Sequence, residues 1–293
     1  MGTKSDNINM PVLLSKLEDV AQYKAGHAHG LLEVIAELID EDLYKKSLPE
    51  ISATAEKIFH CAVNQDDLET AYSAIHKHHY SSADSNSLVK IESTISKMDI
   101  VFEAALKEKN SEIAYKIIKS QKMLYNPRPR DQRDLHKENK VAKLEYMRGS
   151  GFDKLGKVLQ VALETKNVRQ ACSCARDQFD WSQKGTTQAK DALEAITRTV
   201  ELCIEEKEFG KAFELKYHQY SVYAQDNDHE SQEQVFKDLL QLEEAALNTA
   251  SPDLAIISNC VRYVKRKREF TSNSNGTPAA SGTPTTDQPK VTG

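Results

Sequence analysis

The sequence predicts an all-α fold built from repeated helical hairpins. Three observations lead to this prediction. The chain has 293 residues but only 11 Gly and 8 Pro, far fewer turn-forming residues than a fold of short strands requires. Small, aliphatic and aromatic residues recur in register at intervals of about 42 residues. Residues that cap helix N-termini stand at one fixed place in most copies of this pattern.

The repeat aligns on one alanine in each of five copies, called the anchor here, and every other repeat position is counted from it. The anchors are Ala71, Ala114, Ala171, Ala212 and Ala255. Position −9 is small in every copy: Ala62, Ala105, Ala162, Cys203 and Ala246. Position −8 is aliphatic: Val63, Leu106, Leu163, Ile204 and Leu247. Position −12 is large and apolar in four copies: Phe59, Phe102, Leu159 and Val200. Small residues of this kind let two helices pack closely, with the larger side chains filling the seam.

Position −4 gives the periodicity a structural meaning. It holds Asp67, Asn110, Asn167, Glu208 and Ser251, and four of these five are preferred N-cap residues. Each copy therefore predicts a long helix A, a turn of about three residues and a capped helix B packed antiparallel to it. The five hairpins are expected at residues 49–82, 86–125, 134–182, 187–223 and 230–268.

The remaining segments complete a single predicted domain over residues 10–270. Residues 10–48 carry two apolar stripes of helical spacing and predict a further helical pair that caps the array. Residues 126–151 form a basic insertion with an extra helix at Leu135–Arg148, separated from the next helix by Gly149 and Gly151. Residues 1–9 are expected to be flexible, and residues 271–293, rich in Ser, Thr, Gly and Pro, to be disordered.

This array of helical hairpins resembles the α-solenoid class, whose familiar members are the tetratricopeptide and HEAT repeat proteins. The resemblance covers 49–268 and concerns architecture rather than one family, because tetratricopeptide repeats have 34 residues and a different residue pattern. It implies a right-handed or open superhelical array with an extended surface that binds other macromolecules.

Charge is distributed unevenly along a chain whose net charge is −5. Residues 116–157 carry a net charge of +7 and residues 262–269 carry +4. Such blocks attract phosphates or acidic partners, although solvated helix faces and a basic helix C-terminus also explain them. The candidate contacts with nucleic acid or an acidic partner are Lys116, Lys122, Arg128, Arg130, Arg133, Lys137, Lys140, Arg262, Lys265, Arg266, Lys267 and Arg268.

Two polar columns on helix B form a second candidate site. Position +7 holds His78, Gln121, Gln178, Gln219 and Arg262. Position +5 holds His76, Lys119, Arg176 and Tyr217. One interpretation is that these columns line one continuous face and bind an extended ligand. The other is that they are the solvent-facing side of an amphipathic helix.

The sequence predicts no enzyme, no cofactor and no metal site, because catalytic and phosphate-binding motifs are missing. The cluster His76–His79 lacks carboxylates or Cys at ligand spacing, and Asp226–Glu230 lacks the Gly and distal Glu of a calcium loop. The five cysteines contain no C-x-x-C pair and are expected to be free thiols. Trp181 is expected to pack rather than to stack on a ligand.

These observations favour a non-catalytic adaptor that binds a protein or peptide along its curved face. The alternative is a helical array that binds RNA or single-stranded DNA, such as a coat or replication accessory protein. No apolar run long enough for a signal peptide or a membrane span occurs, which predicts a cytoplasmic protein. Arg262–Arg268 also resembles a nuclear import signal. Oligomeric state is not predicted.

Overall fold

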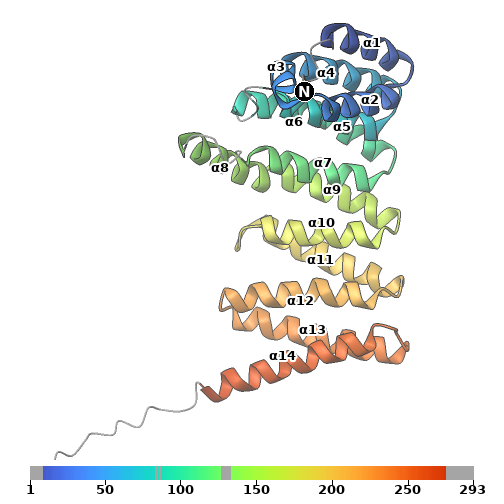
Figure 1. Cartoon of the computed structure of the whole chain (residues 1–293). Coiled ribbons are helices and arrows are strands. Elements are labelled where there is room, and N and C mark those ends of the chain that lie inside the picture. The colour runs from blue at the N-terminus through green and yellow to red at the C-terminus, as the bar shows by residue number, and fades with distance from the viewer. Residues whose placement is uncertain (1–8, 83–84, 86, 127–132, 275–293) are drawn as a thin grey trace, which may run out of the picture. The chain divides into compact units, whose positions relative to one another are not determined.

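The computed structural model describes residues 9–82, 85, 87–126 and 133–274, which form 14 helices and no strand (Figure 1). This confirms the predicted all-α fold. The N-terminal segment holds α1 (Met10–Tyr23), α2 (Ala25–Leu38) and the short α3 (Glu41–Lys46). The first two repeats are α4 (Leu48–Asn64) with α5 (Leu68–Tyr80), and α6 (Leu88–Lys107) with α7 (Ser111–Leu124).

The later repeats follow the same order of helix A and helix B. An extra helix, α8 (Arg133–Arg148), precedes the third repeat, which is α9 (Ser150–Glu164) with α10 (Val168–Trp181). The fourth repeat is α11 (Thr187–Glu205) with α12 (Phe209–Gln225), and the fifth is α13 (His229–Asn248) with α14 (Leu254–Ser274). Their bounds match the predicted hairpins to within a few residues, with two exceptions: the predicted third hairpin, 134–182, also includes α8, and α14 is longer than predicted.

The same main-chain turn joins helix A to helix B in all five repeats. The residue at −5 has a positive φ of 51° to 61°, although none of the five is glycine: Asp66, Lys109, Lys166, Lys207 and Ala250. The N–H at −4 then donates to the carbonyl oxygen at −9, over 2.7 to 2.9 Å. This bond closes a Schellman turn and satisfies a carbonyl that the helix end would leave unpaired.

The predicted caps are present in the first three repeats. The Oδ1 atoms of Asp67, Asn110 and Asn167 each accept a hydrogen bond of 3.1 Å from the backbone N–H three residues later. The four anchors Ala71, Ala114, Ala171 and Ala212 are fully buried, and so are the small residues at −9. Phe59 and Phe102 at −12 are also fully buried, so the predicted seam between helix A and helix B is confirmed in these repeats.

The fifth anchor is wrong, because Ala255 is exposed. Ser251 does not cap in the predicted way; its Oγ accepts from Asp253 N at 3.2 Å, and α14 begins only at Leu254. Pro252 and Asp253 lie in a turn before the helix, so α14 starts later than predicted and a different set of its residues points inward. Among the hydrophobic side chains described over 254–268, those of Ile257, Val261 and Val264 are buried.

The aliphatic column at −8 lies nearer the solvent than predicted. Val63, Leu106 and Leu163 are only partly buried, and Ile204 and Leu247 are exposed. Position −8 follows −9 directly, one step of 100° around helix A. When −9 faces the seam, −8 therefore reaches only its rim.

The N-terminal pair and the extra helix occupy their predicted places. Helix α1 contacts α2 and α4, and α8 contacts α7 and α9. Gly149 separates α8 from α9, as predicted. At Gly151 a Cβ atom would lie 2.8 Å from Cε1 of Tyr146 and 2.9 Å from its carbonyl oxygen, so only glycine allows α9 to approach α8 this closely.

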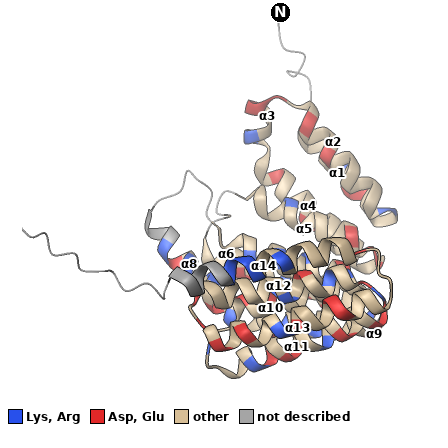
Figure 2. Cartoon of the chain, turned by 90° about the horizontal axis from the view of Figure 1, so that it is seen from below, with Lys and Arg blue, Asp and Glu red and all other residues tan. Residues whose placement is uncertain are grey.

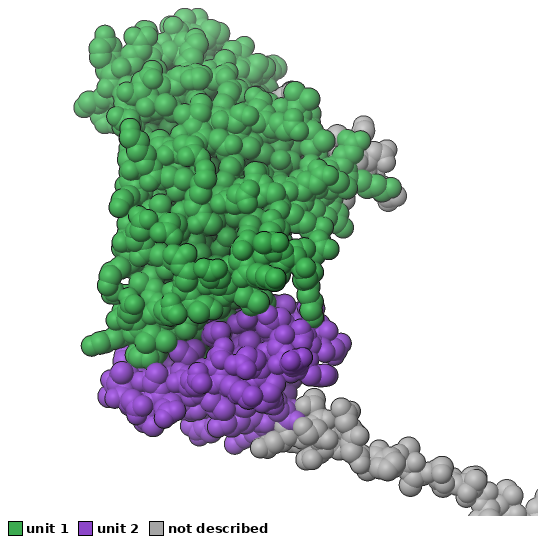
Figure 3. Space-filling view, turned by 180° about the vertical axis from the view of Figure 1, so that it is seen from behind, with its two compact units in different colours: residues 1–215 green, residues 216–293 purple. Residues whose placement is uncertain are grey.

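The chain folds into two compact units, Met1–Leu215 and Lys216–Gly293 (Figure 3). The second unit is held internally by an ion pair of 2.7 Å between Lys216 and Asp238, and by Arg268, whose guanidinium lies 4.1 Å from the ring centre of Phe236. Among the described helices, none combines the length and apolarity needed to cross a bilayer.

The predicted terminal segments are only partly described. Asn9, expected to be flexible, caps α1 by accepting from Val12 N at 3.3 Å, and residues 1–8 lie outside the described part. The predicted tail begins too early at 271, because α14 continues to Ser274. The rest of that tail, 275–293, lies outside the described residues.

Candidate functional site

Position +7 of helix B faces the interior, not the solvent. His78, Gln121, Gln178 and Gln219 have exposed fractions of 5%, 0%, 4% and 5%. The interpretation of this column as the solvent-facing side of an amphipathic helix is therefore wrong for these four residues, and it holds only for the exposed Arg262. A buried polar side chain requires hydrogen-bond partners, and those partners reveal a repeated cluster.

In the first repeat the cluster forms around His78. Its Nδ1 lies 3.0 Å from the carbonyl oxygen of Ser52, and its Nε2 lies 2.8 Å from Nζ of Lys90 and 3.4 Å from Nζ of Lys97. Lys97 also forms an ion pair with Glu56. Burial lowers the pKa of His78, and the two lysines lower it further. The neutral ring therefore donates through Nδ1 and accepts through Nε2.

In the second repeat Gln121 takes the place of the histidine. Its Nε2 donates to Asp99 Oδ1 at 2.6 Å, and its Oε1 accepts from Tyr146 Oη at 2.7 Å and from Lys154 Nζ at 3.1 Å. Lys154 Nζ also lies 2.5 Å from Asp99 Oδ1. The lysine of one helix A thus binds both the acid of the preceding helix A and the +7 residue of the helix B between them.

The two clusters occupy equivalent repeat positions. Lys97 and Lys154 stand at −17 of their repeats, and Glu56 and Asp99 stand at −15 of the preceding ones. We call this arrangement of a −17 lysine, a −15 acid and a +7 acceptor a rung. Rungs join the first repeat to the second and the second repeat to the third.

A groove of about 290 Å³ lies in the first unit, lined by successive B helices. It draws residues from α7, α10 and the first turns of α12: Tyr115, Lys119, Arg169, Cys172, Ser173, Arg176, Asp177, Lys211 and Glu214. We call this the B-helix groove. Four of its side chains are basic and two are acidic, so its lining carries a net positive charge.

The two acids of the groove, Asp177 and Glu214, neutralise only part of this positive charge. Buried Asp177 accepts from Tyr115 Oη at 2.8 Å and pairs with Lys119 Nζ at 3.1 Å. Burial, reinforced by this carboxylate, raises the pKa of Tyr115, which therefore stays a protonated donor. Arg169 and Arg176 are exposed, and neither guanidinium is paired with an acid among the described residues. These two side chains are free to bind an anionic group.

A pair of free thiols lies at the edge of the groove. The sulfur atoms of Cys172 and Cys203 are 3.5 Å apart. The hydrogen bond from Cys203 lowers the pKa of Cys172, and the positive charges of Lys211 and Arg176 act in the same direction. That hydrogen bond and burial raise the pKa of Cys203. Cys172 is thus the more reactive thiol of the two.

The structure brings together only part of the predicted ligand-binding set. Lys119 and Arg176 at +5 both line the B-helix groove. Tyr217 belongs to the second unit, where its ring stacks on Tyr220. His76 lies between Tyr72 and Tyr80. The groove residues that the columns missed, Arg169 and Lys211 among them, stand at the start of their B helices, and neither +5 nor +7 includes that first turn.

Much of the central basic block is neutralised within the fold. Lys116 pairs with Glu69 and Glu112, and the ammonium group of Lys122 lies 4.8 Å from the ring centre of Trp181. Trp181 is buried, which confirms its predicted packing role. Lys137 and Lys140 are exposed on α8, and α8 begins at Arg133. Arg128 and Arg130 lie outside the described residues.

The C-terminal basic block lies along α14 (Figure 2). Arg262, Lys265, Arg266 and Lys267 are exposed, and Arg268 forms an ion pair with Glu233. Within the described residues, no group of three or more His, Cys, Asp or Glu side chains is arranged to hold a metal ion. The Asp226–Glu230 segment joins two helices, and Asp228 caps α13 by accepting from Ser231 N at 3.2 Å.

Comparison with known proteins gives a structural similarity but no family. No family model matches the chain, and no curated protein matches it. Among solved structures, the chain is similar to a circular tandem repeat protein described as having a novel repeat topology and enhanced subunit contact surfaces, at 16% identity and a TM-score of 0.41. The match covers 83% of this chain and 61% of that one. The helical repeat architecture of this chain is evident from its own helix pairs.

Proposed function

We propose that this chain is a non-catalytic helical-repeat protein whose B-helix groove binds an acidic segment of a partner protein. The observation that carries the proposal is the pair of exposed guanidinium groups of Arg169 and Arg176 in that groove, neither of which pairs with an acid in the described part of the chain. Arginine binds carboxylates through two parallel hydrogen bonds. Arg169 and Arg176 lie about two helical turns apart on α10, so together they can hold an extended acidic peptide.

The other groove residues support a peptide rather than a small anion. Tyr115, Ser173 and the half-exposed Lys119 add polar and aromatic surface between the two arginines and α7. A lining drawn from three successive B helices favours an extended ligand that lies across the repeats. Binding of this kind requires no catalytic group.

The test measures binding of a dye-labelled octaglutamate peptide by fluorescence anisotropy. We expect saturable binding to the full chain, and a loss of about tenfold or more in affinity in the double variant Arg169→Gln/Arg176→Gln. Lys190→Glu is the matched control, because Lys190 is an exposed base on α11 outside the groove. Equal loss in both variants would show that binding follows net charge alone and would contradict the proposal.

A second candidate function is nucleic-acid binding through α14. The observation that favours it is the run of exposed bases Arg262, Lys265, Arg266 and Lys267. A salt titration with a 15-residue oligothymidine distinguishes the two functions, because phosphate contacts give a steep decrease of log affinity with log salt. A slope that becomes shallower when these four residues are changed to Gln favours nucleic acid. Absence of oligothymidine binding at 50 mM salt removes this candidate.

A further inference from the structure

The rung that links the first three repeats is missing at the next junction. At the positions where the first two junctions have a lysine and an acid, the third has Ala195 at −17 and Gly156 at −15. The +7 acceptor is still present as Gln178. The backbone and the acceptor are therefore retained, whereas both charged partners have been replaced by the two smallest residues.

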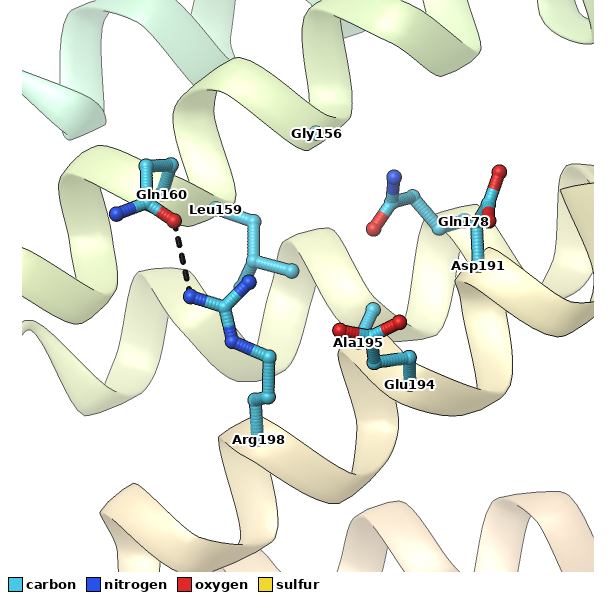
Figure 4. Close-up of a pocket in the computed structure, with 8 residues that line it drawn as sticks. All are labelled: Gly156, Leu159, Gln160, Gln178, Asp191, Glu194, Ala195 and Arg198. Carbon is cyan, nitrogen blue, oxygen red and sulfur yellow. Dashed lines mark hydrogen bonds between the residues drawn. The ribbon is translucent and has the colours of Figure 1, made fainter.

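A pocket of about 180 Å³ occupies the vacated place (Figure 4). Gly156 and Leu159 of α9, Gln178 of α10 and Ala195 of α11 line it. Gln178 is 96% buried, since its exposed fraction is 4%, and its Oε1 has no hydrogen-bond partner among the described residues. In Figure 4 its carboxamide points into the space between Gly156 and α11.

The equivalent acceptor in the second rung shows what this oxygen lacks. Oε1 of Gln121 accepts from the ammonium group of Lys154 at 3.1 Å. A buried acceptor without a donor costs free energy, so the oxygen of Gln178 favours a ligand that supplies an N–H group at the same place. In this chain Ala195 occupies the position of the lysine, and its side chain ends at the methyl group, so it supplies no N–H group.

The charges around the pocket favour a cation. Asp191 and Glu194 lie on its α11 wall, and neither forms an ion pair with a base among the described residues. Arg198, the one base in the lining, donates from Nη2 to Gln160 Oε1 at 2.9 Å and lies with Leu159, away from Gln178 and Asp191 (Figure 4). The lining therefore carries a net negative charge beside an unpaired acceptor.

We infer that this pocket binds a primary alkylammonium group, which takes the place of the lysine that the rung lacks. The ammonium donates to Oε1 of Gln178 and is attracted by Asp191 and Glu194, while its methylene groups contact Leu159 and the Cα of Gly156. A lysine side chain of a partner and a free alkyl diamine share this chemistry. The site is separate from the B-helix groove and does not depend on the function proposed for it.

The test is an NMR titration of the full chain with n-butylammonium chloride, which has the length of a lysine side chain. We expect saturable shifts of the Gln178 side-chain amide, and none with tetramethylammonium, which has no N–H to donate. Asp191→Asn/Glu194→Gln should weaken binding about tenfold, because it removes the two negative charges that attract the ammonium group. Both residues are exposed and the change is isosteric, so the fold should be retained. Equal shifts with both cations would overturn the inference.

Ala195→Lys gives the decisive variant, because it restores the missing lysine within the chain. Binding of n-butylammonium should disappear in Ala195→Lys and persist in Thr197→Lys, which adds the same charge at an exposed position of the same helix. Gly156→Asp/Ala195→Lys rebuilds the whole rung and serves if the single variant folds poorly. A Cβ atom at position 156 is tolerated, since the nearest atom to it, Gln178 Nε2, lies 3.4 Å away. Retained binding in folded Ala195→Lys would contradict the inference.

Two further ligands distinguish the sources of the ammonium group. N-acetyl-lysine methylamide represents a lysine in a partner chain, and 1,5-diaminopentane represents a free diamine. Tighter binding of the lysine derivative supports a protein partner, and tighter binding of the diamine supports a small-molecule ligand. If neither binds, the pocket does not recognise alkylammonium groups and the inference is wrong.

Discussion

The ammonium group of Lys154 lies 2.5 Å from the carboxylate of Asp99, in a helix 55 residues earlier in the chain. The same ammonium binds Gln121, so three helices of two repeats meet at one side chain. Lys154→Met should therefore lower the free energy of unfolding by about 1.5–3 kcal/mol, the range for hydrogen bonds to charged groups. Lys157→Met is the control: its pair with Glu103 is exposed and should cost less than about 1 kcal/mol. Urea unfolding measures both, and equal costs would contradict the importance of the rung.

Two glycines of α9 should respond oppositely to alanine. In Gly151→Ala the new methyl group meets the ring and carbonyl of Tyr146, so we expect a loss of about 1–3 kcal/mol in unfolding free energy. In Gly156→Ala the methyl group has room, and the better helix propensity should stabilise by about 0.5–1 kcal/mol. Thermal unfolding of both variants checks this, and destabilisation by Gly156→Ala would show that the pocket is smaller than described.

The turn in the last hairpin should tolerate glycine better than alanine. Ala250 has a φ of 51°, a region that alanine adopts only with strain. Ala250→Gly relieves this strain, and after the larger unfolded-state entropy of glycine it should stabilise by about 0.5–1 kcal/mol. Ala245→Gly, inside α13, should instead cost about 1 kcal/mol. Chemical unfolding distinguishes these signs, and a loss in both variants would argue against a strained turn.

The cap of the third B helix gives a prediction of known size. Asn167 Oδ1 accepts from Gln170 N, and its Nδ2 donates to Ser111 Oγ at 3.4 Å. Asn167→Ala should lower the free energy of unfolding by about 1 kcal/mol. Asn167→Asp keeps the acceptor and should retain most of the stability. A neutral Asn167→Ala variant in urea unfolding would mean that water replaces the cap at no cost.

Acid should weaken the first repeat through His78. Its folded pKa lies below the ordinary value of 6.5, so the unfolded chain binds more protons as the pH falls. The contribution of this residue is complete above pH 6.5 and is lost as the pH decreases through the folded pKa. His29 and His76 also have lowered pKa values, caused mainly by burial.

The variant His78→Gln isolates this contribution, because three other repeats have Gln at +7. We expect a similar stability at pH 7.5 and a smaller loss of stability below pH 6.5 than in the unchanged chain. Urea unfolding at several pH values measures the difference. Parallel pH profiles for the two proteins would show that His78 is not a source of the acid sensitivity.

The sequence predicts the hairpins well because their determinants are local. A cap, a turn and a small residue at −9 lie within six residues of one another, and Asn110 and Ala105 illustrate this. The fifth repeat departs from the pattern just as locally, because Pro252 and Asp253 lie in a turn and α14 begins only at Leu254. Helix boundaries near Ser274 could not be predicted, because composition alone does not determine where a helix ends.

The site is less predictable because its partners are distant in sequence. Lys119 and Arg176 share the +5 repeat position, whereas the +7 position leaves Gln121 either as a ligand-binding residue or as part of a solvent-facing side. Inside the fold its Oε1 accepts a hydrogen bond from Lys154, which lies 33 residues later. A polar residue in a sequence usually indicates a position in contact with solvent. Only the lysines at −17 and the acids at −15 indicate that the +7 residues have hydrogen-bond partners inside the fold.

The rungs also imply unequal rigidity along the first unit. Local opening of α6 or α9 must break a charged link to the preceding repeat, whereas α11 has alanine at the corresponding place. Amide hydrogens of α11 should therefore exchange with solvent at a lower free-energy cost than those of α6 and α9. The Gln178 pocket would then lie between a rigid helix, α9, and a more mobile one, α11. Movement of α11 would let the pocket accept ligands of slightly different size.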